Sequence, residues 1–92
     1  MIKTEDLMTA LRLAVEVQGH SLRDAAQRLG VTHRTVRKWV LGQTEPYPRN
    51  RMSIYRYCLT AARGWKALWA QHSPVDAQTL SDLLGDNHEN GL

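Results

Sequence analysis

The sequence contains no phenylalanine and a single cysteine, Cys58. One cysteine cannot form an intramolecular disulfide, and the absence of a disulfide framework is typical of proteins in a reducing cytoplasm. No apolar run approaches the ~20 residues that a membrane-spanning helix needs, and residues 1–3 lead into an amphipathic segment rather than a signal peptide. We therefore expect a cytoplasmic protein with no membrane segment.

The residue patterns of common catalytic and metal sites are also missing. The four histidines do not fall at zinc-ligand spacing with Cys58, and no glycine-rich phosphate loop is present. The acidic residues are scattered, with no pair suited to acid-base catalysis, and Cys58 lies on an apolar face where it packs rather than reacts. The sequence predicts a protein that is not an enzyme and that uses no metal and no cofactor, and no small-molecule ligand is evident.

Charges are unevenly distributed along the chain. Residues 67–92 contain no lysine or arginine and four acids, whereas residues 20–66 contain ten cations against only Asp24 and Glu45, a net charge of +8. Residues 1–19 carry a net charge of −1. A run of like charge is usually just a solvated face, but this basic block coincides with the motif described next. We therefore favour a polyanionic partner.

A length of 92 residues with 42% apolar side chains allows one small domain with a single core. The apolar spacing predicts an all-α, compact domain of four to five helices over residues 1–85, followed by a flexible polar tail at residues 86–92. The first helix should begin at the cap Thr4 and end near Gln18 and Gly19. Its apolar stripe would cover the inner faces of the motif, and the stripe consists of Leu7, Leu11, Ala14 and Val15.

Residues 21–42 have the pattern of a helix-turn-helix. Ser21 and Asp24 are placed to form a capping box at the start of the first helix of the motif. Gly30 is placed to end that same helix through a positive φ. Thr32 is a suitable N-cap for a second helix over residues 33–41. The inner positions are apolar: Ala25, Ala26, Leu29, Val31, Val36, Trp39 and Val40.

The same stretch carries a family resemblance. With Gly30 in the turn, Ala26 four residues earlier and WVLGQTEP at residues 39–46, it resembles the phage Cro and repressor (XRE-like) class of helix-turn-helix regulators. The resemblance covers residues 7–60, and the W-x-x-G-x-x-x-P ending is its most specific part. That family often has an acidic residue where this chain has Val40, which suggests extra packing of Val40 against another helix. The alternative is an ordinary helical hairpin with a polar outer face.

These features predict a sequence-specific regulator of double-stranded DNA, most simply a repressor that binds an inverted repeat as a homodimer in a bacterial cell or phage-infected host. Base readout is assigned to the outer face of the second helix, at His33, Arg34, Arg37 and Lys38. Phosphate contacts are assigned to Ser21, Arg23, Arg28, Thr32, Arg49 and Arg51. For several of these cations a merely solvated role is the alternative, and His33 could serve only the start of its helix.

Two other functions use the same features. The first is a DNA-handling accessory factor, such as a small terminase subunit, an excisionase or a transposase-associated domain, which would use the motif without regulating transcription. The second is a protein-interaction module that binds its partner through a surface containing Trp65 and Trp69.

The apolar pattern after the motif predicts a long helix over residues 50–71 with two apolar stripes. One stripe exceeds what so small a monomer can cover, which predicts a homodimer built on the C-terminal helices. In the alternative, Arg63 and Gly64 break the helix and both tryptophans fold into the monomer core. A last helix should start with a cap at Ser73 and proline at Pro74, and should end at Gly85. The predicted dimer interface consists of Trp65, Leu68, Trp69, Leu80, Leu83 and Leu84.

Overall fold

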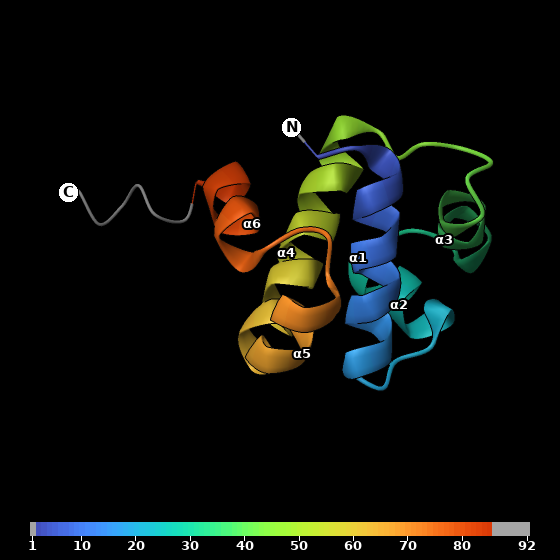
Figure 1. Ribbon diagram of the computed structural model, residues 1–92. Helices are drawn as coiled ribbons and strands as arrows, with labels where there is room; N and C mark the ends of the chain where they lie inside the picture. Colours follow the sequence, from blue (N-terminus) through green and yellow to red (C-terminus); the bar gives the residue numbers. More distant parts are fainter. Residues whose placement is uncertain (1, 86–92) are drawn as a thin grey trace.

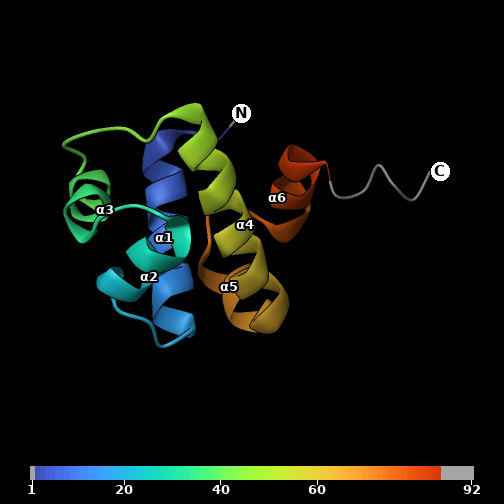
Figure 2. The same ribbon diagram turned by 180° about the vertical axis from the view of Figure 1, so that it is seen from behind.

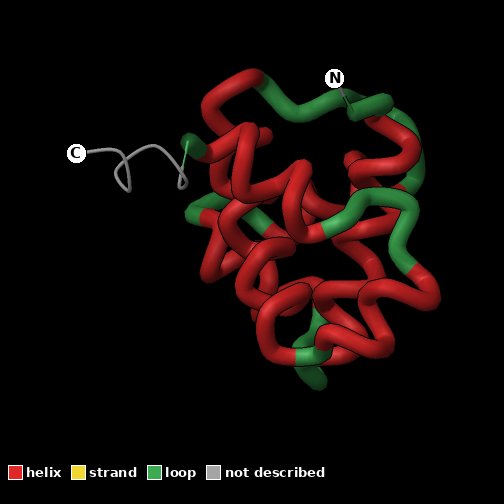
Figure 3. The backbone as a smooth tube through the Cα atoms, turned by 60° about the vertical axis from the view of Figure 1, so that its left-hand side comes forward, coloured by secondary structure: helices red, strands yellow, loops and turns green. Residues whose placement is uncertain are grey.

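The computed structural model describes residues 2–85, and within them the chain forms helices joined by short loops and no strand (Figure 1, Figure 3). The all-α prediction is confirmed, but the described residues form six helices where four to five were predicted, because the predicted helix over residues 50–71 is divided in two. The predicted tail at residues 86–92 lies outside the described residues. The helices are α1 (Thr4–Val17), α2 (Leu22–Leu29), α3 (His33–Val40), α4 (Pro48–Gly64), α5 (Lys66–His72) and α6 (Ala77–Leu84).

Helices α1 and α4 lie side by side and form the centre of the molecule (Figure 1, Figure 2). Helix α2 packs against α3 and α4, and α3 also packs against α1. Helix α6 packs on the other side of α4, and α5 contacts both α1 and α4. The predicted helix-turn-helix and the C-terminal helices therefore lie on opposite sides of the central pair.

The core is one cluster that draws on every helix, and none of the described polar or charged residues is buried. Ala25 and Ala26 in α2 are both buried, and their small side chains let α2 approach its neighbours closely. The largest fully buried side chains are Leu7, Leu11, Val36, Ile54, Cys58 and Leu80.

The ends of α2 and α3 agree with the sequence prediction. Ser21 and Asp24 form a complete capping box, and Thr32 caps α3 by accepting a hydrogen bond from the Thr35 amide at 3.1 Å. Gly30 has a φ of +74°, a conformation that a residue with a Cβ adopts only with strain. The Val31 amide then bonds the Ala26 carbonyl, which closes the end of α2.

The prediction for the start of α1 is wrong. Lys3 occupies the N-cap position and makes no side-chain capping bond, while Thr4 is already the first helical residue. The Thr4 hydroxyl instead donates to Glu45 Oε1 at 3.0 Å, so it joins α1 to the loop after α3. The predicted end at Gln18 and Gly19 is confirmed.

The predicted continuous helix over residues 50–71 is also wrong, and the alternative with a break is correct. Helix α4 ends at Gly64, and Trp65 has a φ of −134° and a ψ of 61°, outside the helical range. The break turns α5 back toward the core, where Trp69 is only 2% exposed and its indole Nε1 donates to the Val75 carbonyl at 2.8 Å. Trp65 remains 40% exposed, so only one of the two tryptophans folds inward.

This break corrects part of the predicted dimer interface. Trp69 and Leu80 are buried in the core of the single chain and are not exposed for contact with a partner. Leu83 and Leu84 are half-buried against the same core. Among the predicted interface residues, only Trp65 and Leu68 are exposed large apolar side chains.

Helix α6 starts later than predicted. Ser73 forms a local turn with Val75 instead of a helix cap, and Asp76 is the N-cap, with its carboxylate accepting from the Thr79 amide at 2.7 Å. This bond, together with the Thr79 side chain, lowers the pKa of Asp76. The end at Gly85 is as expected, and α6 packs against α4.

Candidate nucleic-acid interface

Helix α3 is held from behind by apolar side chains, and this exposes its basic outer face. Val36 and Trp39 are buried one turn apart on the inner side. Arg34, Arg37 and Lys38 are exposed on the other side. This segregation follows from the helical period, because residues three and four apart share a face.

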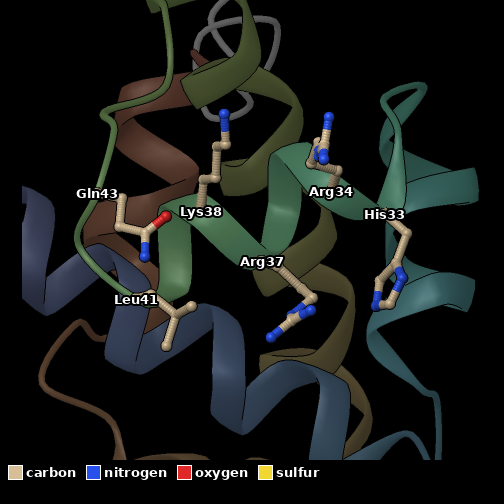
Figure 4. A pocket seen from close by; sticks show the side chains of 6 residues that line it. All are labelled: His33, Arg34, Arg37, Lys38, Leu41 and Gln43. Carbon is tan, nitrogen blue, oxygen red and sulfur yellow. The ribbon is translucent and has the colours of Figure 1, made fainter.

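The outer face of α3 carries two rows of side chains (Figure 4). Arg34 and Lys38 point to one side, and Arg37 and Leu41 point to the other. Together with His33 and Gln43, these side chains line a hollow of about 270 Å³.

The basic side chains of this hollow have no partner within the part of the chain that the structure describes. Arg34, Arg37 and Lys38 make no hydrogen bond or ion pair with residues 2–85, and neither does the imidazole of His33. The domain therefore leaves this set of charges to solvent or to a binding partner. All four residues predicted for base readout share this one surface.

The start of α2 uses Ser21 mainly for capping. The Ser21 amide donates to Asp24 Oδ2 at 2.9 Å, and the Asp24 amide donates to the Ser21 hydroxyl oxygen at 3.0 Å. The bonds from Ser21 lower the pKa of the Asp24 carboxyl, so the cap stays charged at neutral pH. A phosphate contact by Ser21 would therefore be made by the hydroxyl proton and not by the amide.

The other residues predicted as phosphate contacts differ in their surroundings. Arg23, Arg28 and Arg49 are exposed. Thr32 is exposed too, and its hydroxyl oxygen lies 2.9 Å from that of Thr35 as part of the α3 cap. Arg51 is half-buried, and its surroundings are described below.

Arg51 in α4 joins its own helix to the N-terminal segment of the chain, which lies far away in the sequence. Its guanidinium donates to the Ile2 carbonyl at 2.8 Å, to the Thr4 hydroxyl at 3.1 Å and to the Tyr55 hydroxyl at 3.1 Å. Because Thr4 in turn donates to Glu45, the arginine indirectly anchors the loop after α3. The predicted phosphate contact of Arg51 stays a prediction. Its structural role could not be read from the sequence, because no apolar or charge pattern around Arg51 indicates these bonds.

A second contact missed at the sequence level holds the C-terminal end of α3. The Arg12 guanidinium in α1 donates to the Val40 carbonyl. A cation beside the last carbonyls of a helix is favourable because those groups carry partial negative charge. Val40 itself packs partly against the core, as its apolar character suggested.

The turn between α1 and α2 is tied to α4 by His20. Its Nδ1 lies 2.7 Å from the Tyr57 hydroxyl, and the two ring centroids are 5.9 Å apart. Burial raises the pKa of Tyr57 to about 12. This contact fixes the entry to α2 relative to the long helix behind it.

Other types of site were also sought. Among residues 2–85, no group of three or more histidine, cysteine, aspartate or glutamate side chains is arranged to hold a metal ion. Within the same residues, no helix has the length and apolar character needed to cross a membrane.

Comparison with known proteins agrees with this geometry. A model of the Homeodomain-like domain family matches residues 2–41, which span α1, α2 and α3. No curated protein and no solved structure matches the chain. The family match supports a helix-turn-helix domain of the DNA-binding kind, and it is not specific to the Cro and repressor class that the sequence resembles.

Proposed function

We propose that this helix-turn-helix domain binds double-stranded DNA sequence-specifically, with α3 in the major groove. The observation that carries the proposal is the exposed set of cations on α3, which have no partner among residues 2–85. Such a set is costly to cover with a neutral partner, whereas a duplex supplies phosphates and guanine acceptors. The major groove is about 12 Å wide and admits an α-helix.

The two arginines of α3 are assigned to base readout. Arg34 and Arg37 each offer a planar pair of donors that fits guanine O6 and N7. They stand on different rows of the outer face, so they would reach different base pairs (Figure 4). His33 and Lys38 complete the set, with Lys38 able to reach a guanine or the backbone.

Phosphate contacts would fix the register of α3 in the groove. The candidates surround the motif and include Arg23, Arg28 and Thr32, with Arg49 at the start of α4. Phosphate contacts carry no sequence information, but they supply much of the affinity. The net charge of +8 over residues 20–66 is suited to this role.

The regulatory part of the proposal is a homodimer that represses transcription. Trp65 is 40% exposed and Leu68 is 44% exposed. Leu68 also lines a groove of about 480 Å³ between α1 and α5. Two copies joined through this surface would read half-sites about 34 Å apart in an inverted repeat, and occupation of a promoter would block polymerase. The resemblance to the Cro and repressor class supports this assignment.

A DNA-handling accessory factor is the second candidate. The observation in its favour is that the matching family model describes a Homeodomain-like domain, which implies DNA binding without implying repression. A module that binds proteins through both tryptophans is disfavoured, because Trp69 is buried in the protomer.

Selection of bound duplexes from random DNA, with the mass of the complex measured in solution, tests the proposal. A repressor of this kind would select an inverted repeat and bind it as a dimer. An accessory factor would bind duplexes with little selectivity, and failure to bind any duplex at low salt would refute both.

Single-base substitutions in the selected duplex then test the readout assignment. Arg34→Ala and Arg37→Ala should each relax the preference at one base pair by about 1–3 kcal/mol. Arg49→Ala should weaken all sequences alike and reduce the salt dependence, because a phosphate contact is lost. Lys66→Ala, which removes an exposed cation from α5, is the control that should change neither. An equal loss on every duplex for Arg34→Ala would remove its readout role.

A further inference from the structure

Leu41 is a large apolar side chain on the most basic surface of the molecule. It follows α3 directly, one turn after Arg37, and it is 55% exposed. It lines the hollow on the outer face of α3 and a second hollow of about 290 Å³ formed with Arg12, Leu22 and Arg37. An exposed leucine among cations is therefore a feature that the proposed base contacts do not explain.

The fold accounts for only part of this leucine, since it is 55% exposed and its apolar neighbours Val15, Leu22 and Val40 line the second hollow with it. Val36 and Trp39 already anchor α3, and the end of the helix is held by its backbone, with Arg12 donating to the Val40 carbonyl. The backbone at Leu41 has a φ of −87° and a ψ of −2°, within the right-handed region, which polar residues adopt equally well. Its exposed surface points to the same side of α3 as Arg37 (Figure 4).

The surroundings of Leu41 restrict what can cover it. An apolar protein surface would also bury Arg34, Arg37 and Lys38 without partners, which is costly. A duplex satisfies those cations with phosphates and guanine edges, and its major groove also displays one apolar group, the 5-methyl of thymine. DNA therefore matches both the charge and the apolar character of this surface.

We infer that Leu41 is a specificity-determining residue that packs against the 5-methyl group of a thymine. This inference rests on the proposed function, since it requires α3 to lie in the major groove. Leu41 lies four residues beyond Arg37, or ~6 Å along the helix axis. Base pairs are stacked ~3.4 Å apart, so the thymine lies within about two base pairs of the guanine that Arg37 reads.

Replacing thymine by deoxyuridine tests the contact, because this exchange removes the methyl group and retains base pairing. Each thymine of the selected duplex is replaced in turn, and the Kd is measured for the parent protein and for Leu41→Ala. One replacement near the Arg37 guanine should weaken the parent about three- to fivefold, which is the factor expected for one buried methyl group. The same replacement should leave Leu41→Ala unchanged.

Two controls make the result specific. Met52→Ala removes an exposed apolar side chain from α4, at a position that is 38% exposed and has no proposed role in binding, and should retain the full response to deoxyuridine. Urea unfolding of Leu41→Ala should match the parent protein, because the side chain contributes little to the core.

The inference is overturned if no thymine of the duplex responds, or if Leu41→Ala responds as strongly as the parent. Either result, obtained with a duplex that still distinguishes Arg37→Ala, would leave the proposed function intact. Failure to select any duplex would overturn both.

Discussion

The two sides of the central α1 and α4 pair use the same kinds of residue in different ways. On the motif side, α2 and α3 turn their cations outward, and those of the α3 face make no bond with the described chain. On the C-terminal side, α5 and α6 place Trp69 and Leu80 in the core and use Asp76 as a helix cap. The cations of the α3 face are left available for a partner, whereas the Asp76 carboxylate serves the fold as a cap.

The comparison extends to how each side contributes to the core. Helix α2 contributes alanines, so its backbone lies close to α4, and α3 adds Val36 and Trp39. The C-terminal side covers the opposite face of α4 with an indole and Leu80. The motif therefore depends on α4 as a scaffold, and α4 in turn depends on α5 and α6 for cover.

The largest expected effect is on the C-terminal side. Trp69→Ala should lower the free energy of unfolding by about 3–5 kcal/mol, because it leaves a large cavity and removes the bond to the Val75 carbonyl. Trp65→Ala, at a position that is 40% exposed, is the matched control and should cost far less. Urea unfolding measures both. Equal losses would mean that Trp65 is also buried, as in a dimer.

The stability of the protein at alkaline pH depends on two buried groups of α4, the helix that both sides pack against. Burial raises the pKa of Cys58 from 9.0 to about 12 and that of Tyr57 from 10.0 to about 12. The unfolded chain therefore loses these protons first as the pH rises. Stability should be fully present below about pH 9 and should fall progressively up to about pH 12.

The free energy of unfolding, measured with urea at several pH values between 8 and about 12, should show this loss. The range covers the ordinary and the raised pKa values of both groups. In Cys58→Ala, the free energy of unfolding should begin to fall only at the higher pH where Tyr57 loses its proton. In Tyr57→Phe, the fall that begins just above pH 9 should be unchanged. An undiminished decline just above pH 9 in Cys58→Ala would contradict this assignment.

The smallest expected effects are on stability, and they compare the N-cap of α3 with the N-cap of α6. Thr32→Ala should destabilise the protein by about 1 kcal/mol, because the Thr35 amide loses its acceptor. Asp76→Ala removes the equivalent cap of α6. Only Thr32→Ala should also weaken DNA binding, since Thr32 is a proposed phosphate contact. Parallel unfolding and DNA titrations decide this, and unchanged DNA affinity in Thr32→Ala would reduce its role to capping.

The motif side was predictable from sequence because its signals are local. Ser21, Gly30 and Thr32 act within one turn of their own positions, and the helical period separates Val36 and Trp39 from the cations. Such signals depend on neighbours a few residues away, so they can be recognised without knowledge of the fold.

The C-terminal side was predicted less well because its structure depends on distant contacts. The apolar pattern over residues 50–71 fits one helix as well as two. The free energy gained by burying Trp69 favours the break between α4 and α5. The same holds for Arg51, whose acceptors Ile2 and Thr4 lie almost fifty residues away. Nothing near Arg51 in the sequence distinguishes such a structural arginine from a solvated one.

The independence of the α3 outer face has an evolutionary consequence. Arg34, Arg37 and Lys38 make no bond within the described chain, and Leu41 is 55% exposed. Under the proposed function, exchanging these residues should alter target preference at little cost to the scaffold. If α3 reads DNA as proposed, proteins with this scaffold can diverge in their target sequences through a handful of codons. A library randomised at these positions would be a direct source of proteins with new targets.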